Sequence, residues 1–440
     1  MLSSNTQTIA DITAGSSTTY VEFDGVYTDT REKGAGKLFV ALEGERFDGH
    51  AFVQHAEDAG AKAIIAHKEL TTNLPTIIVS NTEEAYRTIA SWHRQSFSPI
   101  VIAITGSNGK TSTKNMLANI LSLDAQTLCT QGNLNNHLGV PKTLLNIKNE
   151  HKYCVIEMGA NHVNEISLLC HLSKPNFAII TNANNAHLGE FGSLDNLVKA
   201  KGEIIDALPT SGVVFINVAS PHKSIWEKIA GNRDCVLFGD NTATFATDIV
   251  EKKSVLQFNL HSNNETTAIT LSMIGRHQIE NAIAATACAA RLGISIDQIK
   301  QGLELTTPEQ GRLNLLQCGN FTILDDSYNA NPHSMKAAID TLASHTGEKI
   351  AVLGSMAELG DESSNLHQEV GDYARQSSVD QLYTIGSDAK HYQGKRFESI
   401  ESLYQHLSDH HSGATILIKG SRQMQLDKLV NLFAKTANSA

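Results

Sequence analysis

The sequence predicts an α/β protein of three domains, and three features of the chain support this fold class. Its 440 residues exceed what one ordinary core supports, and roughly 150 residues per domain suggests about three domains. Short apolar runs alternate with helix-like segments along most of the chain, as in βαβ units. A glycine-rich segment at residues 105–111 lies between a strand-like run and a helical one, which is typical of α/β domains that bind nucleotides.

Composition and charge exclude several classes of function. Apolar residues make up 41% and charged residues 18%, as in a soluble globular protein, and no run approaches the roughly 20 apolar residues of a membrane span. The first residues have neither a basic start nor an apolar block, so we expect no secretory signal and a cytoplasmic location. A net charge of -11 without a basic patch argues against nucleic acid as a partner. The 6 cysteines have no CxxC spacing, which argues against a zinc site or a disulfide framework.

The first predicted domain, residues 1–97, is a small α/β domain. Apolar runs at 37–42, 63–66 and 76–79 have the length and composition of strands, and residues 82–95 have a helical pattern.

The second predicted domain, residues 98–309, contains a mainly parallel sheet with helices on both faces. The run at 99–105 is apolar without alternation and rich in β-branched residues, as buried parallel strands are. Similar runs at 153–156, 177–180 and 213–216 are each followed by a loop and usually a helical pattern.

The third predicted domain, residues 310–440, is Rossmann-like. Helical segments at 277–292 and 293–303 precede residues 306–311, whose proline and glycine indicate a linker. Beyond the linker, strand-like runs again alternate with helical segments; these runs cover residues 321–324, 350–353, 382–385 and 415–418.

Residues 105–111 form the sharpest local motif. Gly106 and Gly109 let the backbone approach phosphate oxygens, Lys110 can reach the β and γ phosphates, and the Thr111 hydroxyl can bind Mg²⁺. The motif is a short variant of the phosphate loop, because Ile104 stands where the first glycine usually does. We expect the loop to hold ATP; the alternative is a turn that merely joins strand to helix.

Three side chains in the same domain are candidates for metal binding or catalysis. Glu157 follows a predicted strand at its carboxyl end, where α/β sheets place ligands, although a salt-bridged or surface acid is the alternative. His187 follows the next strand, but a loop histidine taken alone is more often a solvated side chain. Lys201 lies in the apolar stripe of a helix at 194–208, whereas Lys199 faces the other way. A lysine there either snorkels, meets a carboxylate or carries a modification that changes its charge.

Taken together, the motifs resemble the Mur ligase family across all three predicted domains. Two positions depart from the family pattern: Gln278 stands where asparagine is usual, and Ser355 where aspartate is common. Such a series in one order is far more specific than any single motif. The matching segments are residues 28–31, 38–42, 44–50, 105–111, 132–136, 157–161, 186–188, 199–203, 311–312, 325–332, 356–360 and 418–422.

The resemblance implies an ATP-dependent amide ligase of peptidoglycan precursor synthesis that acts through an acyl phosphate. The pattern is nearest to members that join D-alanyl-D-alanine to UDP-N-acetylmuramoyl-tripeptide, which implies these two partners, ATP, two Mg²⁺ ions, a carbamylated Lys201 and a monomer. The alternatives are another Mur ligase or a folylpolyglutamate-type ligase, which residues 46–50 disfavour, and a P-loop ATPase or UDP-sugar-binding regulator that joins nothing.

The resemblance also assigns roles residue by residue. Solvated surface cations are the alternative for the arginines of the first domain, and turn-forming asparagines the alternative for the Asn-rich loops. The implied catalytic residues are Lys110, His187 and Lys201, and the implied metal ligands are Thr111, Glu157, His187 and Lys201 as a carbamate. The implied ATP-binding residues are Gly106, Ser107, Asn108, Gly109, Lys110, Thr111, Ser112, Asn281, Arg312 and Asp326. The implied substrate-binding residues are Thr30, Arg31, Arg46, Asp48, His50, Asn133, Asn135, Asn136, Tyr328, Asn329 and Asn331.

Overall fold

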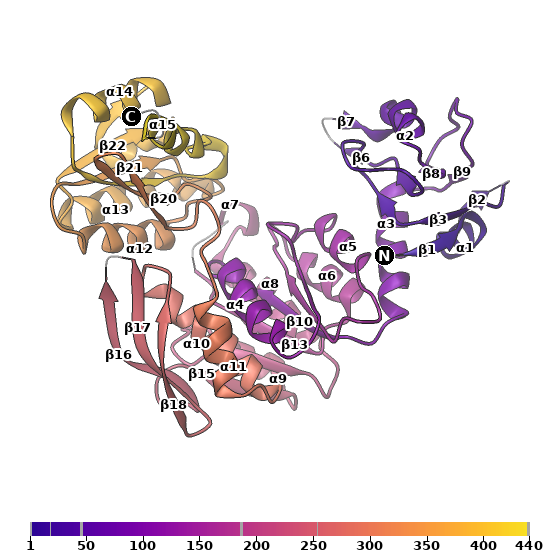
Figure 1. The fold of residues 1–440 in the computed structure, drawn as a ribbon, viewed down its shortest axis with the longest axis horizontal. Coiled ribbons are helices and arrows are strands. Elements are labelled where there is room, and N and C mark those ends of the chain that lie inside the picture. Colours follow the sequence, from indigo (N-terminus) through magenta and orange to yellow (C-terminus); the bar gives the residue numbers. More distant parts are fainter. Residues whose placement is uncertain (1, 18, 45–46, 185–187, 253, 438–440) are drawn as a thin grey trace.

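The computed structural model describes residues 2–17, 19–44, 47–184, 188–252 and 254–437, and their α/β elements form three successive parts of the chain (Figure 1). The expected boundary near residue 97 falls after helix α3 (Thr82–Gln95), and the one near 309 falls after helix α11 (Ile296–Glu304). In the described ranges, no helix combines the length and the apolar character needed to cross a membrane.

The N-terminal part is built on a five-stranded sheet in the order β2-β9-β8-β5-β4. Strand β2 runs antiparallel to β9, and the other neighbours are parallel. Asn81 accepts the N–H of Glu84 and so caps α3, whose bounds agree with the predicted helix at 82–95. The strands of this part are β1 (Ser3–Asn5), β2 (Ser16–Ser17), β3 (Glu22–Asp24), β4 (Val26–Tyr27), β5 (Leu38–Val40), β6 (Glu43–Gly44), β7 (Phe47–Asp48), β8 (Ala63–Ala66) and β9 (Thr76–Ile78). Its helices besides α3 are α1 (Thr6–Ile12), η1 (Gly49–Phe52) and α2 (Val53–Asp58).

The middle part contains a six-stranded, fully parallel sheet in the order β11-β12-β10-β13-β14-β15. Helices cover both faces of this sheet, as predicted. Val101 of β10 packs in one hydrophobic core with Ile166 of α6, and the next residue, Ile102, packs in a second hydrophobic core with Leu117 of α4. The strands are β10 (Ile100–Thr105), β11 (Thr127–Cys129), β12 (Tyr153–Glu157), β13 (Phe177–Ile180), β14 (Val213–Asn217) and β15 (Asp234–Phe238). The helices are α4 (Lys110–Ser122), α5 (Gly139–Leu144), α6 (Glu165–Ser173), α7 (Leu188–Phe191), α8 (Leu194–Asp206), α9 (Lys223–Ala230), α10 (His277–Arg291) and α11.

An antiparallel sheet that the sequence analysis does not anticipate completes the middle part. Strands β16 (Thr244–Lys252), β17 (Val255–Ser262) and β18 (Glu265–Leu271) pair in sequence order and lie beside α10 and α11 (Figure 1). Alternate side chains of β17 are buried in the core that α4 and α10 share. This period of two is the signal in the sequence that indicates the sheet.

The C-terminal part has a six-stranded sheet in the order β19-β20-β24-β21-β22-β23. Only the edge strand β19 is antiparallel to its neighbour, and cores on both faces of the sheet give the predicted Rossmann-like arrangement. The strands are β19 (Asn314–Cys318), β20 (Phe321–Asp326), β21 (Lys349–Gly354), β22 (Gln381–Ile385), β23 (Lys395–Phe397) and β24 (Thr415–Lys419). The helices are α12 (Pro332–Ala343), η2 (Gly360–Glu362), α13 (Ser363–Gln376), η3 (Asp388–Tyr392), α14 (Ile400–His410), η4 (Arg422–Met424) and α15 (Asp427–Ala437).

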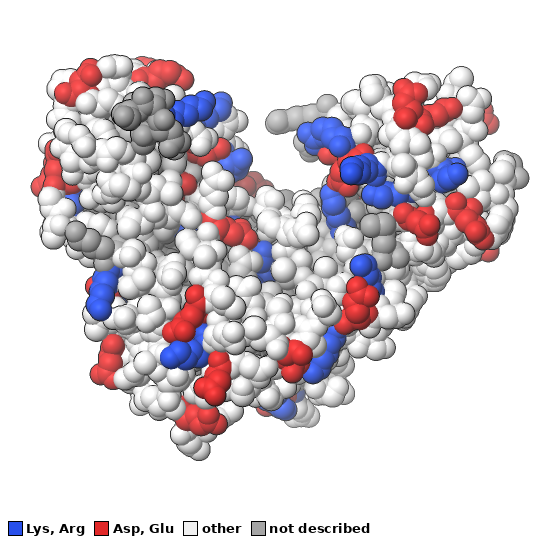
Figure 2. All heavy atoms as spheres, viewed as in Figure 1, with Lys and Arg blue, Asp and Glu red and all other residues white. Residues whose placement is uncertain are grey.

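The middle part lies between the other two, which face each other across a broad hollow in the molecular surface (Figure 2). On one side, the Arg94 side chain of α3 donates through Nε to the Ser173 carbonyl at 2.9 Å. On the other, the Gly189 N–H donates to the Glu358 carbonyl at 2.9 Å. The middle part thus contacts both of the other parts.

Candidate active site

The phosphate loop connects β10 to α4, as the sequence predicts, and its two glycines are structurally required. Gly106 has φ of 150° and Gly109 has φ of 79°, both in the region that favours glycine. A Cβ on Gly106 would clash with Thr181 Oγ1, and one on Gly109 would clash with Asn281 Oδ1. Because α4 begins at Lys110, the free amides of its first turn lie at the loop, where they favour an anion.

The loop after β13 braces the phosphate loop. The N–H of Asn108 donates to Asn182 Oδ1 at 2.9 Å, and the N–H of Ser107 to the Asn182 carbonyl at 3.0 Å. The Thr181 hydroxyl donates to the Asn108 carbonyl at 2.6 Å. Neither Thr181 nor Asn182 is among the predicted site residues. Their contacts hold the loop in shape.

The Lys110 side chain folds back over its own loop. Its Nζ donates to the carbonyl of Gly106 at 2.7 Å and of Ser107 at 3.2 Å. Burial lowers the pKa of Lys110 from its ordinary value; the Glu157 carboxylate opposes this effect and Arg312 reinforces it. A phosphate chain at this position would offer the ammonium an anionic partner that no described residue supplies at hydrogen-bond distance.

Glu157 presents one carboxylate oxygen that no described residue satisfies. The side chain stands at the end of β12 and is 1% exposed. Its Oε1 accepts the Asn135 amide at 2.7 Å, whereas its Oε2 is buried without a hydrogen-bond partner. Thr111, also 1% exposed, lines the same cavity. Since a buried carboxylate oxygen is costly unless paired, these residues fit a hard cation such as Mg²⁺.

Lys201 on α8 is only 3% exposed. This burial argues against the snorkelling alternative, in which the ammonium would reach solvent. Its Nζ lies 5.5 Å from the ring centroid of Phe191, and no hydrogen bond or ion pair from the described residues reaches it. Burial lowers the pKa of Lys201 to about 7; Lys110 acts in the same direction, and Glu203 and Glu165 oppose it. His187 and Arg46 lie outside the described residues.

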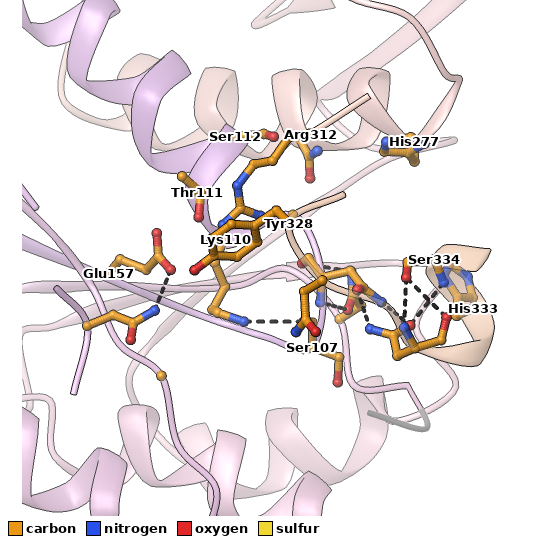
Figure 3. Close-up of a pocket in the computed structure, with 18 of the residues that line it drawn as sticks. Ser107, Lys110, Thr111, Ser112, Glu157, His277, Arg312, Tyr328, His333 and Ser334 are labelled. Atoms are coloured by element: carbon orange, nitrogen blue, oxygen red, sulfur yellow. Dashed lines mark hydrogen bonds between the residues drawn. The ribbon is translucent and has the colours of Figure 1, made fainter. Parts of the chain in front are cut away.

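A cavity of about 450 Å³ joins the middle and C-terminal parts (Figure 3). Such a volume is in the range of small-molecule sites. Most predicted site residues line it: Ser107, Asn108, Gly109, Lys110, Thr111, Ser112, Asn135, Asn136, Glu157, Lys201, Asn281, Arg312, Asp326, Tyr328, Asn329 and Asn331.

The C-terminal part closes one side of this cavity. The guanidinium carbon of Arg312 lies 4.1 Å from the ring centroid of Tyr328, a cation–π contact. Asp326 accepts the Leu313 N–H at 3.1 Å and the ammonium of Lys419 at 2.6 Å. Both Asp326 oxygens therefore have partners within the chain.

Asn281 lies behind the phosphate loop. Its amide donates to Gln278 Oε1 at 2.9 Å, and its Oδ1 accepts the Thr113 hydroxyl at 3.3 Å. Gln278, one of the two departures from the family pattern, thus holds Asn281 against Gly109. In this conformation Asn281 braces the loop, and the adenine contact implied for it stays a prediction.

The predicted residues of the N-terminal part do not line the cavity, and neither does the exposed Asn133. The Arg31 side chain is 89% exposed and donates through Nε to Asp29 at 2.9 Å. Asp48 accepts from Lys68 Nζ at 2.7 Å and pairs with His50; these contacts hold the pKa of Asp48 well below its usual range, Lys68 having the larger effect. Together with Thr30, these residues lie on a part of the molecule separate from the C-terminal part (Figure 1).

Sequence reasoning missed several cavity residues, among them Lys419, His277 and His333. Lys419 ends the buried strand β24 and is 2% exposed, so the rule that identifies Glu157 also identifies it. Burial lowers the pKa of His277 to about 4, the nearby Asp326 opposing this effect and Lys419 adding to it. His333 has no distinguishing signal in the sequence.

Comparison with known families gives one consistent match along the chain. The model described as Mur ligase middle domain matches residues 104–289. The model described as Mur ligase, glutamate ligase domain matches residues 311–422, and the one described as Mur ligase family, catalytic domain matches residues 22–93.

Individual relatives agree over nearly the full length. The UDP-N-acetylmuramoyl-tripeptide--D-alanyl-D-alanine ligase of Escherichia coli K12 is 40% identical over 422 residues, which cover 93% of each chain. The crystal structure of MurF from Acinetobacter baumannii is 33% identical and has a TM-score of 0.93 over 99% of each chain. The MurF ligase from Thermotoga maritima in complex with ADP is 27% identical, with a TM-score of 0.85 over 94% of this chain and 98% of that one. This chain belongs to the Mur ligase family.

Proposed function

We propose that the protein is an ATP-dependent ligase that joins D-alanyl-D-alanine to UDP-N-acetylmuramoyl-tripeptide and releases ADP and phosphate. One structural observation carries the proposal: the phosphate loop, the unsatisfied Glu157 oxygen and the buried Lys201 line the same cavity. The relatives that match 93% of the chain are named for this reaction. The proposal includes a monomeric enzyme that acts in the cytoplasm.

ATP would occupy the cavity with its phosphates on the loop 106–112. The ADP complex of the Thermotoga maritima relative supports this assignment. Lys110 would exchange its contacts with the loop carbonyls for the β and γ phosphates, and Arg312 and Asp326 would contact the nucleotide from the C-terminal part.

The proposal assigns two Mg²⁺ sites to the middle part, as the family resemblance implies. Thr111 and Glu157 would hold one ion, and His187 with a carbamylated Lys201 would hold a second. Mg²⁺ bound by these residues would supply positive charge that neutralises the transferring phosphoryl group.

The environment of Lys201 favours carbamylation. Because burial lowers the pKa of Lys201 to about 7, the neutral amine that carbamylation requires is far more abundant at pH 7 than for an exposed lysine. The lone pair of the neutral amine attacks the carbon of CO₂; a C–N bond forms, one C=O electron pair moves to oxygen, and the nitrogen loses a proton to solvent. The product is an anionic carbamate. The nearby Lys110 ammonium repels the protonated form of Lys201 but attracts the carbamate.

The chemistry then needs two displacements. An oxygen of the tripeptide carboxylate attacks the γ-phosphorus, and the bond to the β-phosphate oxygen breaks to release ADP. The dipeptide amine attacks the carbonyl carbon of the acyl phosphate, phosphate leaves with the bridging oxygen, and the amine gives up a proton. Lys110 would offset the migrating negative charge.

The remaining predicted residues are assigned to a long substrate. Thr30, Arg31, Arg46, Asp48 and His50 would bind the UDP end on the N-terminal part, while the peptide reaches the cavity past Asn133, Asn135 and Asn136. The dipeptide would lie near Tyr328, Asn329 and Asn331. A second cavity of about 110 Å³, lined by Asn329, Asn331 and Arg422 among others, supports this placement.

The test is an acceptor panel. ADP release and product mass are followed with the UDP-muramoyl tripeptide and, in parallel, D-alanyl-D-alanine, D-alanine, L-amino acids or glutamate. We expect a product of the mass of dipeptide addition, with D-alanyl-D-alanine alone. Dependence on another acceptor would make the chain a different ligase of the family, and ADP release without any acceptor would make it an ATPase.

A further inference from the structure

Glu203 of α8 caps a helix to which it does not belong. Its Oε1 accepts the backbone N–H of Asn164 at 2.6 Å, and its Oε2 accepts that of Ser167 at 3.0 Å. Asn164 is the N-cap of α6, has φ of 71° and makes no capping hydrogen bond with its own side chain. Because the first amides of a helix lack intrahelical partners, Glu203 supplies the acceptor that α6 lacks.

The capped segment leads directly back to Glu157. Residues 158–164 connect β12 to α6, and Glu165 accepts the N–H groups of Asn161 at 2.7 Å and His162 at 3.2 Å. Two carboxylates therefore hold the backbone amides of this connection. Asn161 and Glu165 line the cavity, so a shift of the segment moves the cavity wall.

Glu203 lies on the same helix as Lys201, two residues further on. Residues two apart on a helix do not share a face; Lys201 lines the cavity, while the Glu203 carboxylate lies at the end of α6. At its other end α6 is held by Arg94, whose Nε donates to the carbonyl of Ser173, the last residue of the helix. A carboxylate at the N-terminus and a cation at the C-terminus both suit the dipole of α6, and both come from other helices.

We propose that Glu203 is a positioning residue for the reaction, a role that rests on the proposed function. By tying α8 to the first turn of α6, its carboxylate sets the separation between Lys201 and the segment that begins at Glu157. The spacing between the proposed ion site at Glu157 and the proposed ion site at Lys201 depends on that separation. Glu203 itself contacts no reacting group.

The kinetic test compares Glu203→Gln with Asp206→Asn. The first variant keeps the size of the side chain but turns one acceptor oxygen into a donor facing an N–H group. The second removes one carboxylate from the end of the same helix. For Glu203→Gln we expect kcat to fall about tenfold and the Mg²⁺ concentration for half-maximal rate to rise several-fold, as for other groups that support metal ligands. KM for ATP should change less than twofold, since the phosphate loop is untouched; Asp206→Asn should resemble the unmodified protein.

Hydrogen–deuterium exchange supplies a readout without turnover. Peptides covering residues 158–170 should exchange faster in Glu203→Gln than in the unmodified protein, and Asp206→Asn should not differ from it. Unchanged exchange, or a lower kcat with unchanged Mg²⁺ dependence, would overturn the positioning role. If the unmodified protein joins no dipeptide, the proposed function fails, while exchange and the Mg²⁺ dependence of ATP hydrolysis still decide the role of Glu203.

Discussion

The Asn331 amide donates a hydrogen bond to Asn108 Oδ1 at 2.7 Å and thereby joins the C-terminal part to the phosphate loop. The same residue caps α12: its Oδ1 accepts the Ser334 N–H at 2.9 Å in a capping box. One side chain therefore stabilises a helix and connects two parts of the chain across the cavity.

Replacing Asn331 by serine should separate these two roles. Serine is a good N-cap, so the free energy of unfolding should change little, but the donor to Asn108 is lost. We expect kcat/KM for ATP to fall about tenfold, a change of roughly 1.4 kcal/mol. Asn331→Ala should lose both contacts and about 1 kcal/mol of stability. Steady-state kinetics and urea unfolding measure the two effects; equal kcat/KM in Asn331→Ser and the unmodified protein would rule out the connecting role.

Asn135 should matter because it orients Glu157. In Asn135→Ala the Oε1 of Glu157 loses its partner, and the carboxylate is free to rotate. Removing a group that supports a metal ligand typically costs about 10- to 100-fold in affinity or activity. Mg²⁺ titration of ADP formation should therefore shift to higher concentration, and Glu157→Gln should lose more activity than Asn135→Ala. The reverse order of the two variants would argue against a metal at Glu157.

Lys201→Ala should abolish ligation, since no other described side chain can replace the carbamate. Several kcal/mol of charge stabilisation corresponds to a loss of roughly three orders of magnitude in rate. Lys199→Ala is the matched control, because Lys199 is exposed on the same helix. Product formation measured by mass should fall in the first variant and stay within about twofold in the second. Near-normal activity in Lys201→Ala would refute the carbamate proposal.

Much of this site follows from rules about strand ends and loops, and the rest depends on packing. Glycine spacing and an apolar run are enough to predict the phosphate loop, and the carboxyl end of a strand predicts the position of Glu157. The braces by Thr181, Asn182 and Glu203 join segments far apart in the chain, and the sequence does not indicate which backbone groups these side chains reach.

The fold shows the same division. The helix at 82–95 has a strong period and a capping asparagine, so its ends are predicted closely. The sheet β16-β17-β18 escaped prediction because β16 and β18 alternate less regularly than β17. Arg31 and Asp48 do not line the cavity because of how the N-terminal part is placed relative to the middle part. The hydrophobic periodicity of single helices and strands does not indicate this placement.

His277 should make the protein less stable in mild acid. Its pKa is lowered to about 4 in the folded state by burial, against about 6.5 in an unfolded chain. The unfolded state therefore binds more protons between these values, and this residue's contribution to stability is lost as pH falls from about 6.5 to about 4. The slope reaches about 1.4 kcal/mol per pH unit for one proton. The free energy of unfolding in urea, measured at pH 7 and at pH 5, should differ less between the two pH values in His277→Gln than in the unmodified protein. An equal difference in the two proteins would contradict this assignment.

The most direct test of ligation through an acyl phosphate uses UDP-muramoyl tripeptide labelled with ¹⁸O in the reacting carboxylate. After reaction with ATP and D-alanyl-D-alanine, mass spectrometry measures the label in the joined product and in the released phosphate. We predict one ¹⁸O in the new amide carbonyl and one in phosphate, because the bridging oxygen leaves with phosphorus. Unlabelled phosphate together with unchanged tripeptide would show that the protein hydrolyses ATP without joining its substrates, and would contradict the proposed function.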